Sequence, residues 1–398
     1  MKSINLDYTA AAPVDPVVLE AMLPFFTEHY GNPSSGHRLG EKPKQALDEA
    51  REKVARLIGI GSGDLIFTAS ASESNNLALK GVARALRKKG NHIISSAVEH
   101  FSVLNPLKTL EKEGFDVTLL PVDRFGLISP DDLAAAINDQ TILVSIQTAN
   151  PEIGTIQPIE KLTAVARKKD ILFHTDAAAA AGWIPLNGNR SGVDMITLAG
   201  DQFYGPKGAA ALYLRRGIRL APLIEGGIQE KGRRAGTENV PAIVGLGEAA
   251  RLAFEDMEER RSRVAAVRDA LKKELFARVP HLQMNGHPDR RLPNNLNISV
   301  QFVEGEALLM RLNMAGIYVS SGSSCTSQAL KSSHVLSAIG LPPELAQGSL
   351  LLAPGKDSSE KDVTCVAEQL AEVAELLRNM SPLYHKFLKE DNKNAPVQ

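Results

Sequence analysis

The sequence predicts an α/β protein with a mostly parallel β-sheet covered by helices on both faces, followed by a second, smaller unit. Short apolar segments typical of strands alternate with amphipathic helical segments between about residues 40 and 250. A long charged segment follows, and strand and helix patterns then resume. The chain has 398 residues, which is long enough for two units with buried cores.

The strands of the first unit are predicted from short apolar runs that alternate with amphipathic segments. An apolar strand that begins at Met195 runs into a polar turn and then into the loop Gly205-Pro206-Lys207-Gly208. Helices fit between the strands, for example over residues 44–57 and 159–168. The other predicted strands span residues 65–68, 92–95, 117–120, 142–146, 171–174 and 210–214.

The second unit is predicted to begin after one long charged helix over residues 250–275, which connects the two units. Residues 295–300 alternate like a half-buried strand, and residues 305–314 have a helical pattern. A last helix has one apolar face, and the chain from Pro382 onwards is expected to be a polar, frayed tail. The apolar face consists of Val363, Val366, Leu370, Val373 and Leu377.

These patterns predict the limits of the domains. A large domain is expected over residues 13–250. A small domain is expected from residues 1–12 together with 251–385, and residues 386–398 are expected to form the tail.

Composition excludes several classes of function. The formal net charge is -1 and 43% of residues are hydrophobic, so neither a nucleic-acid footprint nor a basic membrane patch is indicated. No apolar run approaches the about 20 residues that span a bilayer, and residues 1–7 lack the apolar core of a signal peptide. The two cysteines, Cys325 and Cys365, do not form a disulfide framework. We therefore expect a soluble, cytoplasmic protein.

Four motifs together resemble one enzyme family. They are Gly31-Asn32-Pro33-Ser34-Ser35, the segment 67–76, the segment 195–208 and the segment 320–327. With the flanking matches from Asp7 to about Tyr384, they resemble the class V, pyridoxal-phosphate-dependent cysteine desulfurases. The resemblance implies a homodimer of fold-type-I architecture, with a seven-stranded sheet in the large domain and pyridoxal phosphate as the cofactor.

The segment 67–76 matches the strand, loop and helix that hold the cofactor phosphate in that family, which assigns Ala71 and Ser72 to the phosphate. A helix N-terminus with free backbone N–H groups and a hydroxyl suits an anion. The alternative is an ordinary helix cap with Ser72 and Glu73 in the first turn.

Four further residues match cofactor contacts of the family. His100 matches the histidine that stacks on the pyridine ring, although a lone histidine is more often structural. Asp176 matches the carboxylate that pairs with the pyridine nitrogen, the alternatives being a helix cap or a local ion pair. Asn150 is also assigned to the cofactor. Thr237 matches a threonine that reaches the phosphate of the neighbouring subunit, which implies a homodimer.

The chain departs from the family where the cofactor would be bound covalently. The family has Ser-x-His-Lys immediately before its Gly-Pro-Lys-Gly loop, and that lysine forms a Schiff base with the cofactor. Gln202 stands in its place, and a carboxamide nitrogen is not nucleophilic enough to form an imine. Lys207 is the nearest amine. It matches an ordinary lysine of the family, with a rescued Schiff base as the less favoured alternative.

Other departures affect the phosphate, the ring and the substrate. Ala199 and Asp201 replace the serine and the histidine of the same motif, and Asp201 brings negative charge towards the phosphate. Leu351 replaces an arginine that clamps the substrate carboxylate, and leucine offers no charge-assisted pair. Ala179 and Pro151 replace a glutamine and an asparagine of the family. Changes at so many contacts indicate drift away from ordinary pyridoxal chemistry.

Cys325 is the predicted functional thiol. Its Gly/Ser-rich segment, residues 320–327, matches the family loop whose cysteine takes sulfur from the substrate as a persulfide. The alternative for a lone cysteine is a small buried hydrophobe. Cys365 has no motif around it, lies one position off the apolar face of the last helix, and is expected to be structural.

Three functions remain open at this point. The first is sulfur transfer or iron–sulfur cluster ligation through Cys325 in cluster assembly, with Schiff-base chemistry lost. Since one thiolate cannot fill a four-thiolate site, a scaffold protein or sulfur acceptor would be the partner. The second is an active cysteine desulfurase that binds pyridoxal phosphate non-covalently and makes alanine and an enzyme persulfide. The third is a regulatory subunit that pairs with an active paralogue through Thr237.

Overall fold

The computed structural model describes residues 3–61, 65–321 and 333–394. Its large sheet has seven strands in the order β2 (Leu65–Thr68), β8 (Ala210–Leu214), β7 (Met195–Ala199), β6 (Leu172–Asp176), β5 (Thr141–Ser145), β3 (His92–Ser96) and β4 (Asp116–Leu120). Only β8 runs antiparallel to its neighbours. The predicted α/β fold class is therefore confirmed, and the strands predicted by residue range lie within two residues of the observed bounds.

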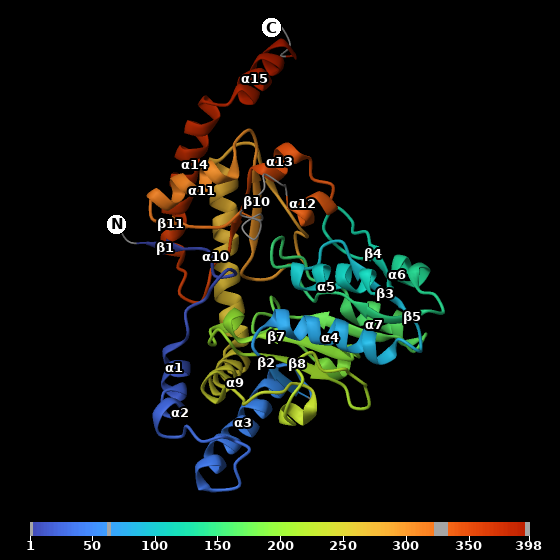
Figure 1. Ribbon diagram of the computed structural model, residues 1–398. Helices are drawn as coiled ribbons and strands as arrows, with labels where there is room; N and C mark the ends of the chain where they lie inside the picture. The colour runs from blue at the N-terminus through green and yellow to red at the C-terminus, as the bar shows by residue number, and fades with distance from the viewer. Residues whose placement is uncertain (1–2, 62–64, 322–332, 395–398) are drawn as a thin grey trace.

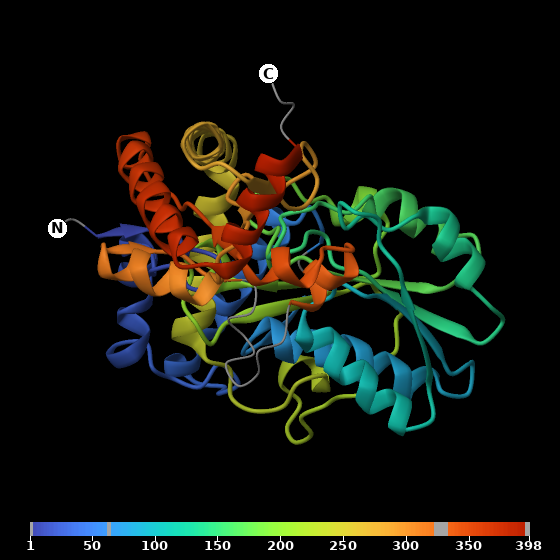
Figure 2. The ribbon, with the colours of Figure 1, turned by 90° about the horizontal axis from the view of Figure 1, so that it is seen from above.

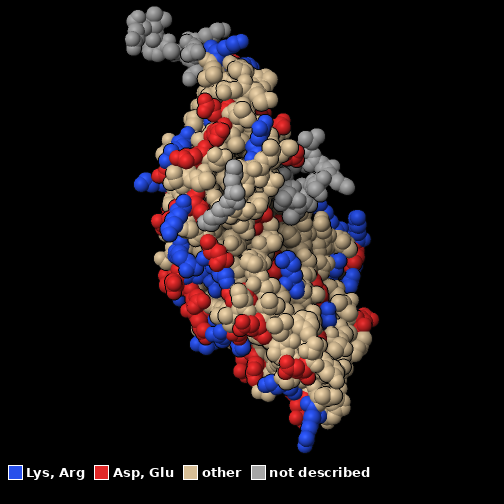
Figure 3. Space-filling view, turned by 90° about the vertical axis from the view of Figure 1, so that its left-hand side faces the viewer, with Lys and Arg blue, Asp and Glu red and all other residues tan. Residues whose placement is uncertain are grey.

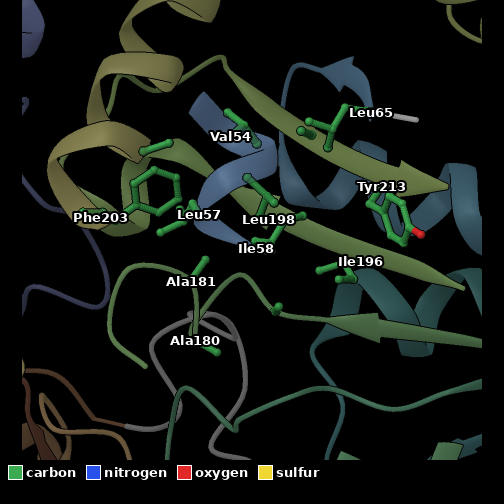
Figure 4. Close-up of a cluster of buried hydrophobic side chains, with 14 of the residues drawn as sticks. Val54, Leu57, Ile58, Leu65, Ala180, Ala181, Ile196, Leu198, Phe203 and Tyr213 are labelled. Atoms are coloured by element: carbon green, nitrogen blue, oxygen red, sulfur yellow. The ribbon is translucent and has the colours of Figure 1, made fainter. Parts of the chain in front are cut away.

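Helices cover both faces of this sheet because successive strand residues point to opposite sides (Figure 1). On one face, α4 (Ala71–Leu86) and α5 (Phe101–Lys112) pack on Ile66, Ile93 and Leu212. The other face packs against further helices and loops, and Figure 4 shows Val54 and Leu57 against Leu198 there. Among the helices that contribute buried residues on this other face are α3 (Arg38–Leu57), α6 (Pro130–Ala136), α7 (Ile159–Arg167) and α9 (Val240–Glu255).

A second hydrophobic cluster lies in the smaller unit, which combines both ends of the chain. Strand β10 (Leu296–Val300) lies between β9 (Leu282–Met284) and β12 (Ser349–Leu352), antiparallel to both. The N-terminal β1 (Ile4–Asn5) pairs in parallel with β11 (Ile317–Tyr318). Helices α10 (Met257–Arg278), α11 (Gly305–Met314) and α14 (Val363–Asn379) complete the cluster. The domain limits given from the sequence remain a prediction.

Short helices, the C-terminal helix α15 and three 3-10 turns complete the architecture of the described residues. They are α1 (Pro16–Met22), α2 (Pro24–Thr27), α8 (Gly188–Ser191), α12 (His334–Ala338), α13 (Pro343–Gln347), α15 (Pro382–Asn394) and the 3-10 turns η2 (Gly200–Phe203), η3 (Gln229–Gly232) and η5 (Glu360–Asp362). Seen from above, the smaller unit lies over one end of the sheet (Figure 2).

The single helix predicted over residues 250–275 is wrong. The chain breaks at Asp256, where α9 ends and α10 begins. The physical reason is that α9 packs in the core of the large sheet, whereas most of the buried apolar residues of α10 belong to the core of the smaller unit. Ala250 and Ala253 of α9 are buried against the large sheet, whereas Leu271 and Leu275 of α10 are buried in the smaller unit.

The frayed tail predicted from Pro382 is also wrong, because residues 382–394 form α15 (Figure 1). An aromatic contact anchors this helix. Phe302 lies with its ring centroid 4.9 Å from that of Phe387 and 5.5 Å from that of Tyr384. Aromatic pairs at this spacing add stability beyond the area that they bury, which offsets the polar composition of the segment.

The surface agrees with the near-zero net charge. Figure 3 shows Lys and Arg interspersed with Asp and Glu over one face, without a broad region of a single sign. Within the described residues, no helix is both long and apolar enough to cross a membrane.

Candidate active site

The candidate site lies at the carboxyl ends of β6 and β7, where helices α4 and α5 begin nearby. Asp176 is the last residue of β6, and Gln202 follows the end of β7 in the turn η2. Because β6 and β7 are parallel neighbours, both residues lie at the same edge of the sheet. Ligands of open α/β sheets bind at this edge.

Asp176 is a buried carboxylate whose oxygens each accept one hydrogen bond. Asn75 Nδ2 of α4 donates to Oδ2 at 2.6 Å, and the backbone N–H of Ala178 donates to Oδ1 at 2.9 Å. Burial raises the pKa of Asp176, and these two hydrogen bonds and the nearby His100 oppose that effect. Among the described residues, no Lys or Arg forms an ion pair with it, so the ion-pair alternative fails. A buried carboxylate of this kind fits a protonated ring nitrogen.

His100 is the N-cap residue of α5, which gives it a structural role as well as a place near Asp176. Its Nδ1 accepts from the backbone N–H of Ser102 at 3.1 Å and lies 2.8 Å from Ser102 Oγ. Ser102 Oγ in turn accepts from Asn75 Nδ2 at 2.8 Å. Two side chains that sequence matching named separately, His100 and Asp176, are thus joined through Asn75 and Ser102.

The first turn of α4 combines a helix cap with open donors. Ser70 is the N-cap and accepts from the backbone N–H of Glu73 at 3.1 Å, while the Glu73 carboxylate accepts from the backbone N–H of Ala69 at 2.9 Å. Ala71 is half-buried and Ser72 is exposed. The cap foreseen as an alternative is therefore present. It leaves the hydroxyl of Ser72 available for a ligand, so the two interpretations are compatible.

Asn150 and Thr237 occupy different surroundings. Asn150 is buried: its Oδ1 accepts from the N–H groups of Glu152 and Ile153, and its Nδ2 donates to Val98 O at 3.0 Å. That leaves one amide hydrogen of Nδ2 for a ligand. Thr237 is exposed and lines a cavity of about 160 Å³ together with Thr68 and Ala69, directly before α4.

No amine stands at position 202. The Gln202 carboxamide nitrogen is 3.4 Å from Thr9 O, and its backbone oxygen accepts from Trp183 Nε1 at 3.0 Å. The neighbouring Asp201 is half-buried, which raises its pKa, while its own backbone N–H and Lys207 act in the opposite direction. Lys207 is exposed.

Three further residues that the resemblance contrasts with polar residues of the family are apolar. Ala199 is buried at the end of β7, and Ala179 is half-buried in the turn after β6. Leu351 is buried in β12, where its backbone exchanges hydrogen bonds with that of Ser320. None of these three side chains offers a polar contact to a phosphate, a ring oxygen or a carboxylate.

Two glutamates near the site, the buried Glu99 and the half-buried Glu152, were missed by sequence reasoning. Glu99 accepts from Ser96 Oγ at 2.6 Å and from the backbone N–H of Gln147 at 3.0 Å, and burial raises its pKa to about 8. Glu152 accepts from Ser333 Oγ at 2.8 Å, and burial raises its pKa to about 8 as well. Asn75 and Ser102 were missed too. The available signal was an asparagine in a helix interior, which local propensity disfavours.

The predicted thiol and metal ligand, Cys325, lies outside the described residues. Cys365 is exposed on α14, so the expectation of a structural role gains no support from burial. Within the part of the chain that is described, no group of three or more His, Cys, Asp and Glu residues is placed to hold a metal ion.

The described residues fit pyridoxal phosphate in part. Asp176 suits the ring nitrogen, and the N-terminus of α4 suits the phosphate. Gln202 cannot supply the covalent bond, because a carboxamide nitrogen is not a nucleophile.

Comparisons with known proteins bear on the whole chain. The family described as aminotransferase class V matches residues 4–340. A cysteine desulfurase IscS of Methanosarcina thermophila is 48% identical over 385 residues, covering 97% of this chain and 95% of the relative. A cysteine desulfurase IscS of Dictyoglomus turgidum is 48% identical over 381 residues, covering 96% and 97%. A solved NifS-like protein is similar with a TM-score of 0.89 at 36% identity, covering 94% of this chain and 100% of that one.

Proposed function

The chain belongs to the aminotransferase class V family, among its cysteine desulfurases, and from this premise we propose that it is a cysteine desulfurase whose cofactor is not bound covalently at residue 202. The reaction would convert L-cysteine and the thiol of Cys325 into L-alanine and a persulfide on Cys325. Similarity to curated desulfurases at 46–48% identity over nearly the full chain supports this activity.

The buried carboxylate of Asp176 is the observation that carries the proposal. It accepts two hydrogen bonds and has no Lys or Arg partner among the described residues. Burying a carboxylate in this way is costly unless a cationic partner arrives. Pyridoxal phosphate, held between Asp176, His100 and the first turn of α4, would supply an electron sink for cleaving bonds at the carbons of the amino acid.

The chain's own residues would then carry out the sulfur transfer. The Cys325 thiolate attacks the sulfur of the substrate, a sulfur–sulfur bond forms, and the carbon–sulfur bond breaks. The carbon keeps the electron pair of the broken bond and takes up a proton to become the methyl group of alanine. Gln202 has no basic nitrogen with which to move protons, so His100 would have to carry them.

A second function is favoured by Gln202 and Leu351. Without an amine at 202 or an arginine at 351, the protein would accept a persulfide made elsewhere, or lend Cys325 to a cluster in iron–sulfur assembly. A single thiolate needs ligands from a scaffold or acceptor partner. In both proposals the protein is a homodimer, with Thr237 reaching the site of the neighbouring subunit.

One experiment separates the two functions. We would measure alanine released from L-cysteine by the purified protein with added pyridoxal phosphate and a thiol reductant, comparing Cys325→Ala, Asp176→Ala and the control Cys365→Ala. The desulfurase predicts alanine that is lost in the first two variants and kept in the control. Well-folded protein that makes no alanine would overturn the desulfurase. Sulfur transfer that depends on Cys325 but not on Asp176 would then support the carrier.

A further inference from the structure

We infer that Asn75 and Ser102 are positioning residues that hold the neutral imidazole of His100 with its proton on Nε2 and link that ring to Asp176. The path has four members, from Asp176 through Asn75 and Ser102 to His100. Its significance for catalysis rests on the proposed function, but the path itself does not.

The direction of the path is fixed at Asp176. An ionised carboxylate only accepts, so the group facing Oδ2 at 2.6 Å must donate, and this is Asn75 Nδ2. The reversed amide would place Asn75 Oδ1 against a carboxylate oxygen. The second hydrogen of Nδ2 points to Ser102 Oγ at 2.8 Å. Both amide hydrogens of Asn75 are therefore used.

Ser102 determines the direction of the hydrogen bond to the imidazole. Its hydroxyl oxygen accepts from Asn75, so its own hydrogen is left to donate to His100 Nδ1 at 2.8 Å. The backbone N–H of Ser102 donates to the same nitrogen at 3.1 Å. A ring nitrogen that receives two donors is unprotonated, which leaves the proton of the neutral ring on Nε2.

The unpaired Oδ1 of Asn75 shows that this arrangement lowers the stability of the folded protein. Asn75 Oδ1 is buried and has no hydrogen-bond partner among the described residues. A buried acceptor without a partner lowers stability, and an apolar residue at this helix position would avoid the loss. The asparagine is explained by the two donors that it directs to Asp176 and Ser102.

The consequence concerns what His100 offers to a ligand. No described residue bonds to its Nε2, and the residue as a whole is exposed. In its neutral state the ring therefore presents an N–H donor at Nε2. It can donate a hydrogen bond or a proton to a substrate first, and can accept a proton at that nitrogen only afterwards.

The test is the nitrogen spectrum of the full chain labelled with 15N-histidine, recorded before and after pyridoxal phosphate is added. The His100→Gln variant assigns the His100 signals. We expect Nδ1 to resonate as an unprotonated, hydrogen-bonded nitrogen and Nε2 as a protonated one. In Ser102→Ala and Asn75→Ala, the Nδ1 signal should move towards that of a nitrogen without a hydrogen bond.

Asn76→Ala is the matched control, since Asn76 lies on the same helix and, among the described residues, its Nδ2 bonds to the backbone oxygen of Ser72 alone. It should leave the His100 signals unchanged. A proton found on Nδ1 of the wild-type neutral ring would overturn the inference, as would an Nδ1 signal that does not respond to Ser102→Ala. Because the first spectra contain neither cofactor nor cysteine, a protein that makes no alanine would leave this result unaffected.

Discussion

Gln202 decides what chemistry is available at the edge of the sheet. The residue follows β7 in the turn η2, at the same edge as Asp176, yet its side chain carries an amide instead of an amine. The backbone around it is well anchored, because Trp183 donates to its carbonyl oxygen. A change of this side chain should therefore alter the chemistry without disturbing the fold.

We predict that Gln202→Lys forms a covalent bond with pyridoxal phosphate but does not restore full desulfurase activity, because Leu351 and Ala179 are unchanged. Mass spectrometry after borohydride reduction should show the cofactor adduct at residue 202. Gln202→Met, which has similar length and no amine, should show none there. Full activity in Gln202→Lys alone would contradict the interpretation that several contacts to cofactor and substrate are missing. A cofactor adduct at Lys207 in the wild type would support the alternative in which Lys207 forms the Schiff base.

Glu152 makes the stability of the protein depend on pH. Burial raises its folded-state pKa to about 8, while Ser333 donates one hydrogen bond and the other carboxyl oxygen, Oε1, has no partner among the described residues. An acid whose folded pKa is raised contributes its full stability below the unfolded pKa, loses it as the pH rises from the unfolded towards the folded value, and contributes none above the folded value. The loss therefore falls between about pH 4.5 and pH 8.

We predict that Glu152→Gln is more stable than the wild type at pH 8, by on the order of 2 kcal/mol, and nearly equal to it at pH 5. Glutamine keeps an acceptor for Ser333 and cannot ionise. Urea unfolding at both pH values measures the difference. The exposed Glu20→Gln serves as the control and should change neither value by more than about 0.5 kcal/mol. Equal pH slopes for Glu152→Gln and the wild type would show that Glu152 is ionised in the folded protein.

Helix α4 shows how one element combines folding and binding. Ser70 caps its first turn. The Glu73 carboxylate accepts a hydrogen bond from the backbone N–H of Ala69 and forms an ion pair with Arg234 at an N–O distance of 3.0 Å. Ser72, the residue before Glu73 in the same turn, is exposed and takes part in neither of these interactions. Deeper in the same helix, Asn75 reaches Asp176. The first turn thus holds separate residues for the cap and for a ligand.

We predict that two serine variants of this turn affect different properties, one the stability of the protein and the other its binding of the cofactor. Ser70→Ala should lower the free energy of unfolding by about 1 kcal/mol, because the N–H of Glu73 loses its acceptor. Ser72→Ala should change stability by less than about 0.5 kcal/mol but weaken binding of pyridoxal phosphate several-fold. Urea unfolding and a cofactor titration measure the two quantities. Unchanged cofactor affinity in Ser72→Ala would remove Ser72 from the phosphate site.

The two units of the molecule are joined beside the site by buried polar contacts. Asn295, just before β10, donates to the backbone oxygens of Pro151 and Glu152 at 2.9 and 3.1 Å. It accepts from Arg291 at 3.2 Å, and Arg291 also donates to Ile153 O at 3.3 Å. Gly154 has a φ of +77°, and a Cβ there would lie 2.5 Å from Asn295 Oδ1. Only glycine allows so close an approach.

We predict that Asn295→Ala lowers the free energy of unfolding by about 2 kcal/mol, since two carbonyls and a buried guanidinium lose a partner. Amide hydrogen exchange in residues 152–156 should become faster at the same time. The exposed Asn313→Ala is the control and should change neither measurement. A loss of stability without faster exchange in residues 152–156 would mean that Asn295 does not hold this loop in place.

Local sequence patterns were sufficient to predict the fold class and almost all of the large sheet, because strand burial and helix periodicity are short-range features. Strands such as Leu65–Thr68 and Ala210–Leu214 have the predicted bounds. Motif matching selected Asp176 and His100, and the family is confirmed. The cofactor roles of Ala71, Ser72, Asn150 and Thr237, and the role of Cys325, remain predictions.

What depended on tertiary structure were the features set by contacts between distant residues. The helix break at Asp256 lies where the chain passes from the core of the large sheet to that of the smaller unit, in which most buried apolar residues of α10 pack. Helix α15 is stabilised by the contact between the rings of Phe302 and Phe387. The raised pKa values of Glu99 and Glu152 arise from burial, which no local pattern around them indicated. The path from Asp176 to His100 joins residues of three elements, so its hydrogen-bond direction exists only once the chain has folded.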